Sequence, residues 1–357
     1  MTDSGMKGCK NTMEITKKLF GTTADGQEVH VYRMENKSGA YVELLDWGAH
    51  IRAIGMPDRD GNIVDVCLGF DDVAGYEKYA GTYMGATVGR IANRLKSACF
   101  KLNNIVYHLS ANEGKNQLHG GIHGFDSKMW ECVMQEHLIS FYRNSEHMEE
   151  GFPGLMRITV NFELTSTNEL IITYTAMSEE DTLVNLTNHA YFNLAGGGSV
   201  AGQTLQVNAS RITPVDSELI PTGEYMGVEN SSFDLRTAKE LGEAVHGDHP
   251  MMQAANGFDI NYILDGDGMR SAAVMTCPAN GIRMTCYTDM PCIQVYSGNY
   301  LDAENGKGGA HYGEHGAVCL ETQRYPNAAN IPSFPSVVLK ARDIFRTRTV
   351  YAFDLLD

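Results

Sequence analysis

Apolar residues recur at every second position over long stretches of this chain, and that period constrains its fold more than any other feature. A helix repeats about every 3.6 residues, whereas a strand with one buried face repeats every two. In residues 157–165, the apolar positions are Ile158, Val160, Phe162 and Leu164. After a polar turn at 166–169, the alternation resumes with Leu170, Ile172, Tyr174 and Ala176. The two runs predict a β-hairpin.

The same period recurs at three other places. Residues 100–109 alternate around Asn103-Asn104, a pair that tolerates the left-handed conformation of a two-residue turn. Residues 282–286 alternate, Pro291 interrupts the pattern, and residues 293–295 resume it. Near the end of the sequence, one strand face is expected to carry Thr349, Tyr351, Phe353 and Leu355.

Helical signals are few. Residues 237–240 have the spacing of a capping box, and Leu241 and Val245 follow four apart, which predicts one short helix before Gly247. A second short helix is expected within residues 71–79. The 37 glycines suit many short strands joined by loops. We therefore expect an all-β protein, a large antiparallel β-sandwich with a few short helices.

The domain count follows from length and continuity together. A chain of 357 residues suggests about two domains, but all-β folds often exceed that size as one unit. No low-complexity linker, charge run or shift in composition divides the sequence. We expect a frayed N-terminal tail over residues 1–12 and a single domain over residues 13–357.

Charge and cysteine usage narrow the partners and the compartment. Lys plus Arg number 28 and Asp plus Glu 44, which gives a net charge of −16. Nucleic acids and anionic membranes attract clustered basic residues, so neither is an expected partner. The eight cysteines form no CxxC pair, which is typical of reduced, mostly buried thiols. Without an apolar signal segment or a membrane-length apolar stretch, the expected location is cytoplasmic.

Five segments carry more polar residues than a core requires: 89–94, 116–121, 185–194, 256–259 and 319–323. Each ends or follows an expected strand, where binding residues concentrate on rigid scaffolds. Glu321 comes at the end of a strand expected from the apolar run 317–320. A buried carboxylate must be paired, hydrogen-bonded or functional, so a structural ion pair with an arginine competes with a catalytic role.

His189 and Arg94 also have two interpretations each. Asn185, Asn188 and Asn193 flank His189, and their amides suit either a structural histidine or one oriented for chemistry. Arg94 can clamp hydroxyl groups through its fork of N–H donors, although an exposed arginine is common.

No metal or cofactor motif stands out. His119 and His123 have HxxxH spacing, but that spacing aligns metal ligands only on a helix, and Gly120-Gly121 disfavours one. The glycines at 196–198 lack the spacing and the basic residue of a phosphate-binding loop. We therefore expect neither a metal nor a cofactor.

Taken together, the polar segments closely resemble those of the aldose 1-epimerase, or galactose mutarotase, family. The matching motifs are VGRIANR at 88–94, QLHGG at 117–121, NLTNHAYFNL at 185–194, NGFD at 256–259, QVYSGN at 294–299 and LETQ at 320–323. They follow the family's order over roughly residues 13–357. Two positions depart from the family's pattern, Ile260 where a histidine is frequent and Asn327 where an aspartate is usual, and they put the sugar preference in doubt.

The resemblance implies a β-sandwich of the galactose mutarotase type that binds an aldohexose in an open cleft. By motif, Glu321 would be the general base and His189 the general acid. The residues expected to bind or surround the sugar are Asn93, Arg94, His119, Tyr191, Asp259 and Gln294. The implied reaction, interconversion of the α and β anomers of free hexoses such as D-galactose and D-glucose, requires no cofactor.

The chemistry suits these residue types. A glutamate with an ordinary pKa of about 4.3 is ionised at pH 7, and a histidine near 6.5 can hold or release a proton. Two alternatives stay open. One is a catalytically silent sugar-binding or regulatory module. The other is an epimerase of hexose 6-phosphates, for which only Arg90 and Arg94 are near the expected cleft. The sequence is compatible with a monomer or a homodimer.

Overall fold

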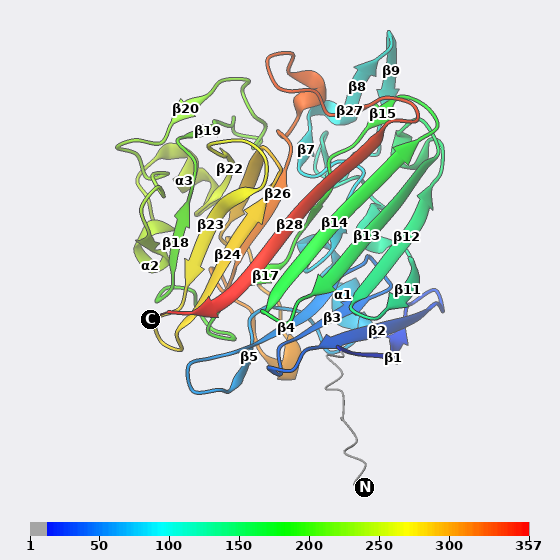
Figure 1. The fold of residues 1–357 in the computed structure, drawn as a ribbon. Coiled ribbons are helices and arrows are strands. Elements are labelled where there is room, and N and C mark those ends of the chain that lie inside the picture. Colours follow the sequence, from blue (N-terminus) through cyan, green and yellow to red (C-terminus); the bar gives the residue numbers. More distant parts are fainter. Residues whose placement is uncertain (1–12, 357) are drawn as a thin grey trace, which may run out of the picture.

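The computed structural model describes residues 13–356, in which strands far outnumber helices (Figure 1). The predicted tail over residues 1–12 lies outside the described residues. The largest sheet has nine strands in the order β11 (Glu131–Gln135), β12 (Leu138–Ser145), β13 (Met156–Leu164), β14 (Glu169–Ser178), β28 (Ile344–Leu355), β24 (Ile282–Thr288), β23 (Arg270–Thr276), β18 (Thr204–Val207) and β21 (Lys239–Glu240). In Figure 1, the red strand β28 runs between the green β14 and the yellow β24.

A six-stranded sheet packs against one half of the nine-stranded sheet. Its order is β17 (Tyr191–Phe192), β26 (Val318–Gln323), β25 (Cys292–Tyr296), β22 (Asp259–Ile263), β19 (Arg211–Thr213) and β20 (Met226–Gly227). The Tyr351 hydroxyl donates to the Leu320 carbonyl, and the rings of Tyr351 and Phe192 lie 4.8 Å apart. These contacts join the two sheets as a sandwich, so the predicted fold class is confirmed.

The other half of the nine-stranded sheet is covered by an N-terminal sheet. That sheet has the order β1 (Glu14–Thr22), β2 (Glu28–Glu35), β3 (Tyr41–Leu45), β4 (Ile51–Pro57) and β5 (Ile63–Asp65). Tyr32 on β2 meets Phe141 on β12 edge to face at 5.6 Å. Four two-stranded pairs complete the strands: β6 (Thr87–Val88) with β16 (Thr187–Asn188), β7 (Arg94–Leu95) with β10 (Gln117–Leu118), β8 (Cys99–Leu102) with β9 (Ile105–His108), and β15 (Thr182–Leu183) with β27 (Val338–Leu339).

The predicted hairpins are confirmed. Strands β13 and β14 pair antiparallel around the turn at 165–168. Strands β8 and β9 turn at Asn103 and Asn104, both with positive φ, as a two-residue turn requires. Strand β28 buries Thr349, Tyr351 and Phe353 on one face as predicted, whereas Leu355 at its end is exposed.

Three short helices are present in the described residues: α1 (Val73–Lys78), α2 (Leu241–Ala244) and α3 (Pro250–Ala255). The prediction within 71–79 is confirmed, with Asp72 capping α1. The predicted short helix before Gly247 is confirmed as α2, but the capping box at 237–240 is wrong, because Lys239 and Glu240 pair with β18 as an edge strand and the helix starts only at Leu241. Helix α3 was not predicted, although Pro250 at its start and Asn256-Gly257 at its end are boundary signals.

The side chains of β26 point alternately to the two faces of the six-stranded sheet, and this alternation sets the direction of Glu321. Leu320 belongs to the core between the sheets, and Thr322 hydrogen-bonds Thr349 on β28. Glu321 and Gln323 therefore point to the opposite face of the six-stranded sheet. The sequence placed Glu321 at the end of this strand, whereas the strand continues to Gln323, whose buried amide donates to Asn261.

The described cysteines are free thiols: Cys67, Cys99, Cys132, Cys277, Cys286, Cys292 and Cys319. Five of the seven are buried, as the sequence predicted. Cys9 lies outside the described residues. Within residues 13–356, no helix has the length and apolar character needed to cross a membrane.

Candidate active site

A cavity of about 250 Å³ opens on the face of the six-stranded sheet that is turned away from the sandwich core. Seven of the eight residues predicted for the site line it: Asn93, Arg94, His119, His189, Tyr191, Asp259 and Glu321. They come from five separate segments of the chain. The sequence prediction thus converges on one place, with Gln294 as the exception.

Gln294 supports the cavity from beneath. It stands opposite Glu321 in the pairing of β25 with β26, and its amide Nε2 donates to Asp259 Oδ1 at 2.6 Å. Its own carbonyl oxygen accepts from Gln323 Nε2 at 3.4 Å, and that amide also donates to Asn261 at 3.0 Å. Gln294 is buried and does not line the cavity, so in this structure it orients Asp259.

Glu321 and His189 meet within the cavity. His189 Nε2 lies 3.7 Å from Glu321 Oε1, and both side chains are almost completely buried. Two of their buried atoms, His189 Nδ1 and Glu321 Oε2, have no hydrogen-bond partner in the described residues. Buried polar atoms are normally paired, so these two are available to a ligand.

Backbone and aromatic contacts hold His189, rather than the flanking amides. The backbone N–H of His189 donates to the Ala86 carbonyl at 2.9 Å, and its backbone carbonyl accepts from the backbone N–H of Gly85 at 2.9 Å. The side chains of Asn185, Asn188 and Asn193 bond backbone carbonyls instead of the imidazole. The ring of Tyr191 stacks on His189 with centroids 5.0 Å apart.

Burial shifts the protonation of this pair toward the uncharged forms. Desolvation, with a smaller contribution from the Asp259 charge, raises the pKa of Glu321 well above its ordinary value, and Arg94 opposes the rise. Desolvation lowers the pKa of His189 to about 4. Both shifts act in the direction of a protonated Glu321 beside a neutral His189.

His119 is fixed as a hydrogen-bond donor. The backbone N–H of Asn93 donates to His119 Nδ1 at 3.2 Å. The backbone N–H of His119 donates to the backbone carbonyl of Asn93 at 3.1 Å. Burial, with the charges of His189 and Arg94, lowers the pKa of His119 well below its ordinary value. A neutral ring that accepts at Nδ1 must carry its proton on Nε2.

This tautomer weakens the case for a metal centre. His119, His189 and Glu321 each offer a ligand atom, and the three atoms lie within 4.8 Å of one another. A metal needs an unprotonated ring nitrogen. His119 has its Nδ1 lone pair engaged by Asn93 and its Nε2 protonated, so it fits a sugar oxygen better than a cation.

Arg94 is buried and paired, not exposed. Its Nε and Nη2 donate to the two carboxylate oxygens of Glu113, each at 2.8 Å. Its Nη1 lies 3.6 Å from Asp259 Oδ2. Arg90, the other basic residue expected near the cleft, points elsewhere: its guanidinium donates to Ser145 and to backbone carbonyls at 145, 146 and 153.

Several residues of the cavity wall were not predicted. They are Gly81, Thr82, Tyr83, Glu113, Leu118, Leu219, Tyr296 and Tyr300. Tyr296 lies inside the QVYSGN motif, so the motif itself was a signal for it. Leu219 begins the segment LIPTG at 219–223, which also resembles the family. Tyr83 and Glu113 come from loops whose local sequence carries no such pattern, because only the tertiary fold brings them to the site.

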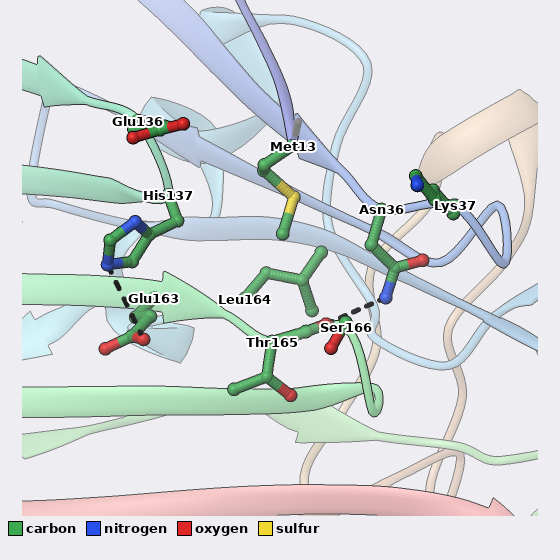
Figure 2. Close-up of a pocket in the computed structure, with 9 residues that line it drawn as sticks. All are labelled: Met13, Asn36, Lys37, Glu136, His137, Glu163, Leu164, Thr165 and Ser166. Carbon is green, nitrogen blue, oxygen red and sulfur yellow. Dashed lines mark hydrogen bonds and ion pairs between the residues drawn. The ribbon is translucent and has the colours of Figure 1, made fainter. Parts of the chain in front are cut away.

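A second cavity, of about 420 Å³, lies beside the turn between β11 and β12 (Figure 2). His137 Nε2 faces Glu163 Oε1 there at 3.9 Å, and Asn36 donates to the Thr165 carbonyl. Both members of the His137–Glu163 pair are well exposed, so water screens their interaction. None of the predicted site residues lines this cavity.

Comparison with known proteins places the chain. The family model described as aldose 1-epimerase matches residues 30–352. The chain belongs to the aldose 1-epimerase family. A galactose mutarotase from Bos taurus is 38% identical over 96% of this chain and 99% of its own length. An aldose 1-epimerase from Escherichia coli is 33% identical over 92% of this chain and 96% of its own length.

Solved structures agree with the aldose 1-epimerase assignment. A GalM/aldose epimerase homologue from C. elegans superposes with a TM-score of 0.85 at 31% identity, covering 91% of this chain and 98% of its own. A galactose 1-epimerase from Lactobacillus acidophilus gives a TM-score of 0.85 at 25% identity, covering 97% of this chain and 100% of its own. The resemblance inferred from the motifs is confirmed.

The two departures from the family pattern lie off the cavity. Ile260 is buried in the core between the sheets, on the face of β22 opposite Asp259. The side-chain oxygen of Asn327 accepts from the backbone N–H of Lys96 at 3.1 Å, and the backbone N–H of Asn327 donates to the Arg94 carbonyl. Neither lines the cavity, so neither has direct contact through which to set the preferred sugar.

Proposed function

We propose that this protein catalyses the interconversion of the α and β anomers of free aldohexoses, with Glu321 as the general base and His189 as the general acid. The observation that carries the proposal is the buried Glu321–His189 pair at 3.7 Å, with one unpaired polar atom on each partner. The names of the relatives, galactose mutarotase and aldose 1-epimerase, support the reaction class.

The reaction suits a base and an acid this close together. Ring opening removes the proton of the anomeric hydroxyl and delivers another to the ring oxygen, while the bond between that oxygen and the anomeric carbon breaks. Both oxygens are attached to the same carbon. The resulting aldehyde rotates about its bond to the next carbon, and the ring closes on the other face with the two transfers reversed. No net proton is consumed.

The pair needs one proton throughout this cycle. Ring opening starts from an ionised Glu321 and a protonated His189, and ring closure starts from a protonated Glu321 and a neutral His189. The two forms hold the same number of protons and differ only in where the proton sits. Burial shifts the empty site toward the form that suits ring closure. Binding of a cyclic sugar must therefore favour the ionised form, through hydrogen bonds to the charged groups.

The remaining polar residues would hold the hydroxyl groups. Arg94 and the Nε2–H of His119 supply donors, and Asp259, oriented by Gln294, supplies acceptors. Asn93 fixes His119, and Tyr191 forms an aromatic wall whose hydroxyl already donates to the Thr82 carbonyl. Donors and acceptors in one small cavity match a polyol such as galactose or glucose.

Polarimetry tests the proposal directly. Freshly dissolved α-D-galactose and α-D-glucose should approach their equilibrium rotation faster with catalytic amounts of the protein than in buffer alone. Folded protein that gives no acceleration with either sugar would contradict the proposal. The ratio of kcat/KM between the two sugars then gives the preferred hexose.

The two alternatives make different demands on the cavity. A phosphorylated hexose needs clustered basic groups, but Arg94 is the single Lys or Arg in the described cavity wall and already faces Glu113 and Asp259. A silent binding module has no use for a buried acid–base pair. The cytoplasmic location and the monomeric or homodimeric state stay predictions.

A further inference from the structure

We propose that Glu113 is a positioning residue that fixes the guanidinium of Arg94 for the sugar. The inference rests on the proposed function, in which Arg94 contacts the substrate. Glu113 takes up two N–H groups of Arg94 in a bidentate pair, both at 2.8 Å. A bidentate carboxylate sets the plane of a guanidinium as well as its position.

The bidentate pair decides which edge of Arg94 faces the cavity. Of the five N–H groups of an arginine, Glu113 takes the one on Nε and one on Nη2. The Nη1 edge is turned toward Asp259, whose Oδ2 is 3.6 Å away, beyond hydrogen-bond distance. Its donors are thereby held beside Asp259, where a sugar hydroxyl can bridge the two side chains.

The location of Glu113 argues against an ordinary surface ion pair. The Arg94 side chain is only 10% exposed, whereas that of Glu113 is 35% exposed on the rim. The loop around Glu113 is itself anchored to the site: Asn112 Nδ2 donates to the Tyr83 hydroxyl at 3.1 Å and to the Leu118 carbonyl at 3.0 Å. Glu113 thus connects an exposed loop to the buried arginine.

Glu113 also affects the charges that act on the catalytic pair. Arg94 faces Glu113, Asp259 and Glu321, and its positive charge lowers the pKa of Glu321 against the effect of burial. The other titratable groups around Glu321 are His189, His119, Asp259, Tyr191, Cys319 and Tyr351. Glu113 partly neutralises Arg94. Without its carboxylate, the field of Arg94 acts more strongly on Glu321, so the pair should lose its proton at a lower pH.

Glu218 offers a matched control on the same rim. Its carboxylate pairs with Lys115 at 2.8 Å and accepts from Asn116 Nδ2 at 3.0 Å. Its side chain is 41% exposed and does not line the site cavity. Glu218→Gln therefore removes the same charge from the neighbouring loop and leaves the Arg94 contact intact.

The experiment measures KM and kcat by polarimetry with galactose from pH 3 to pH 10 for the wild type and four variants. Glu113→Gln should raise KM about tenfold with kcat changed less than threefold, and shift the alkaline limb of kcat/KM to lower pH. Glu113→Asp, which keeps the charge, should retain the alkaline limb of the wild type. Glu218→Gln should match the wild type, and Arg94→Ala should lose at least a hundredfold in kcat/KM.

The outcomes separate the inference from the proposed function. If Arg94→Ala is impaired while Glu113→Gln keeps the wild-type KM and alkaline limb, the positioning role is wrong and the sugar site stands. If Arg94→Ala is as active as the wild type, the site assignment fails and the role of Glu113 fails with it. If Glu113→Gln does not fold, Glu113→Asp provides the test. Its shorter side chain should raise KM for galactose and leave the alkaline limb of kcat/KM unchanged. A wild-type KM in Glu113→Asp would overturn the inference.

Discussion

Glu321 and His189 each keep a buried polar atom that has no hydrogen-bond partner among the described residues, and both atoms belong to side chains that line the cavity. Desolvation pushes both residues toward their uncharged forms, which is the usual environment of groups that exchange protons with a substrate. Such atoms destabilise an empty protein, because a buried unpaired polar group costs free energy. At these two residues, the unpaired atoms lower the stability of the folded protein and stay available to a substrate.

Glu321→Gln is expected to separate turnover from stability. Loss of the base should reduce kcat by about 10²–10⁴-fold while galactose binding persists. Because the folded-state pKa of Glu321 is raised, the wild type loses stability as the pH rises above the unfolded value of about 4.3 toward the folded one. The variant has no such loss, so its Tm relative to the wild type should increase with pH.

Thermal unfolding from pH 4 to pH 8, with polarimetry and calorimetric galactose titration, measures both effects. Glu179→Gln, which removes an exposed carboxylate paired with Arg157, serves as the control. Unchanged turnover in Glu321→Gln would remove Glu321 from its proposed role. A Tm difference that does not grow with pH would show that its pKa is not raised.

The pH profile of kcat/KM should be bell-shaped with an unusually acidic lower limb. The proposed cycle needs one proton on the Glu321–His189 pair. Activity should fall at low pH when a second proton binds, near the His189 pKa of about 4, and at high pH when the raised Glu321 pKa is passed and the pair loses its proton. Initial rates at low galactose check this. A lower limb centred near 6.5 would mean that His189 titrates like an exposed histidine.

Individual site residues could be predicted from sequence where motif and chemistry coincide. The local pattern marked Glu321, after an apolar run, and His189, among polar residues, as candidates, and the family resemblance supplied their predicted roles. Glu113 and Tyr83 could not be found, because their importance arises from contacts with Arg94 and His119 that form only in the folded chain. Sequence does not show which member of a hydrogen-bonded chain reaches the cavity, and the predicted contact of Gln294 with the sugar stays a prediction.

At the scale of elements, strand β26 serves two purposes with alternate side chains. Leu320 packs in the core, whereas Glu321 and Gln323 form part of a polar layer on the other face. Period-two patterning predicted β8, β9, β13, β14, β24, β25 and β28, because a strand with one buried face leaves a clear signal. It failed where both faces are buried, as at 321–323, and at Lys239–Glu240, where a weak helix signal lost to edge pairing with β18.

Gln323→Leu tests whether the polar layer orients the site. Gln323 is fully buried and donates to Gln294 and Asn261, so its loss should reduce the free energy of unfolding by about 1–3 kcal/mol. Gln294 would then be free to rotate its amide, and Asp259 would lose its fixed donor. We expect KM for galactose to rise several-fold with little change in kcat. Urea unfolding and polarimetry measure the two effects, and an unchanged KM would show that Gln294 is held without Gln323.

At the scale of the whole molecule, the cavity gathers residues from Gly81 to Glu321, which are more than half the chain apart. One apolar core extends from Tyr32 to Phe353 and includes side chains from the three large sheets. The sequence predicted the sandwich and its family, because periodicity and motifs are local. It did not predict the strand order of the nine-stranded sheet, because strands distant in sequence pair there.

We propose that residues 13–357 unfold as one domain. A continuous core should give a single cooperative transition in which circular dichroism, fluorescence of Trp47 and Trp130, and loss of mutarotase activity coincide. Urea titration followed by the three probes checks this. Two separated transitions would indicate that the N-terminal sheet, which contributes Tyr32 and its neighbours to the core, unfolds on its own.

The central place of β28 in the nine-stranded sheet has a consequence for the protein as it is being made. Strands β14 and β24, which flank β28, both leave the ribosome before it does. Until residues 344–355 emerge, the nascent chain carries two unpaired strand edges, and such edges invite pairing with other chains. The risk that the nascent chain pairs with other chains therefore depends on how quickly β28 emerges after β14 and β24.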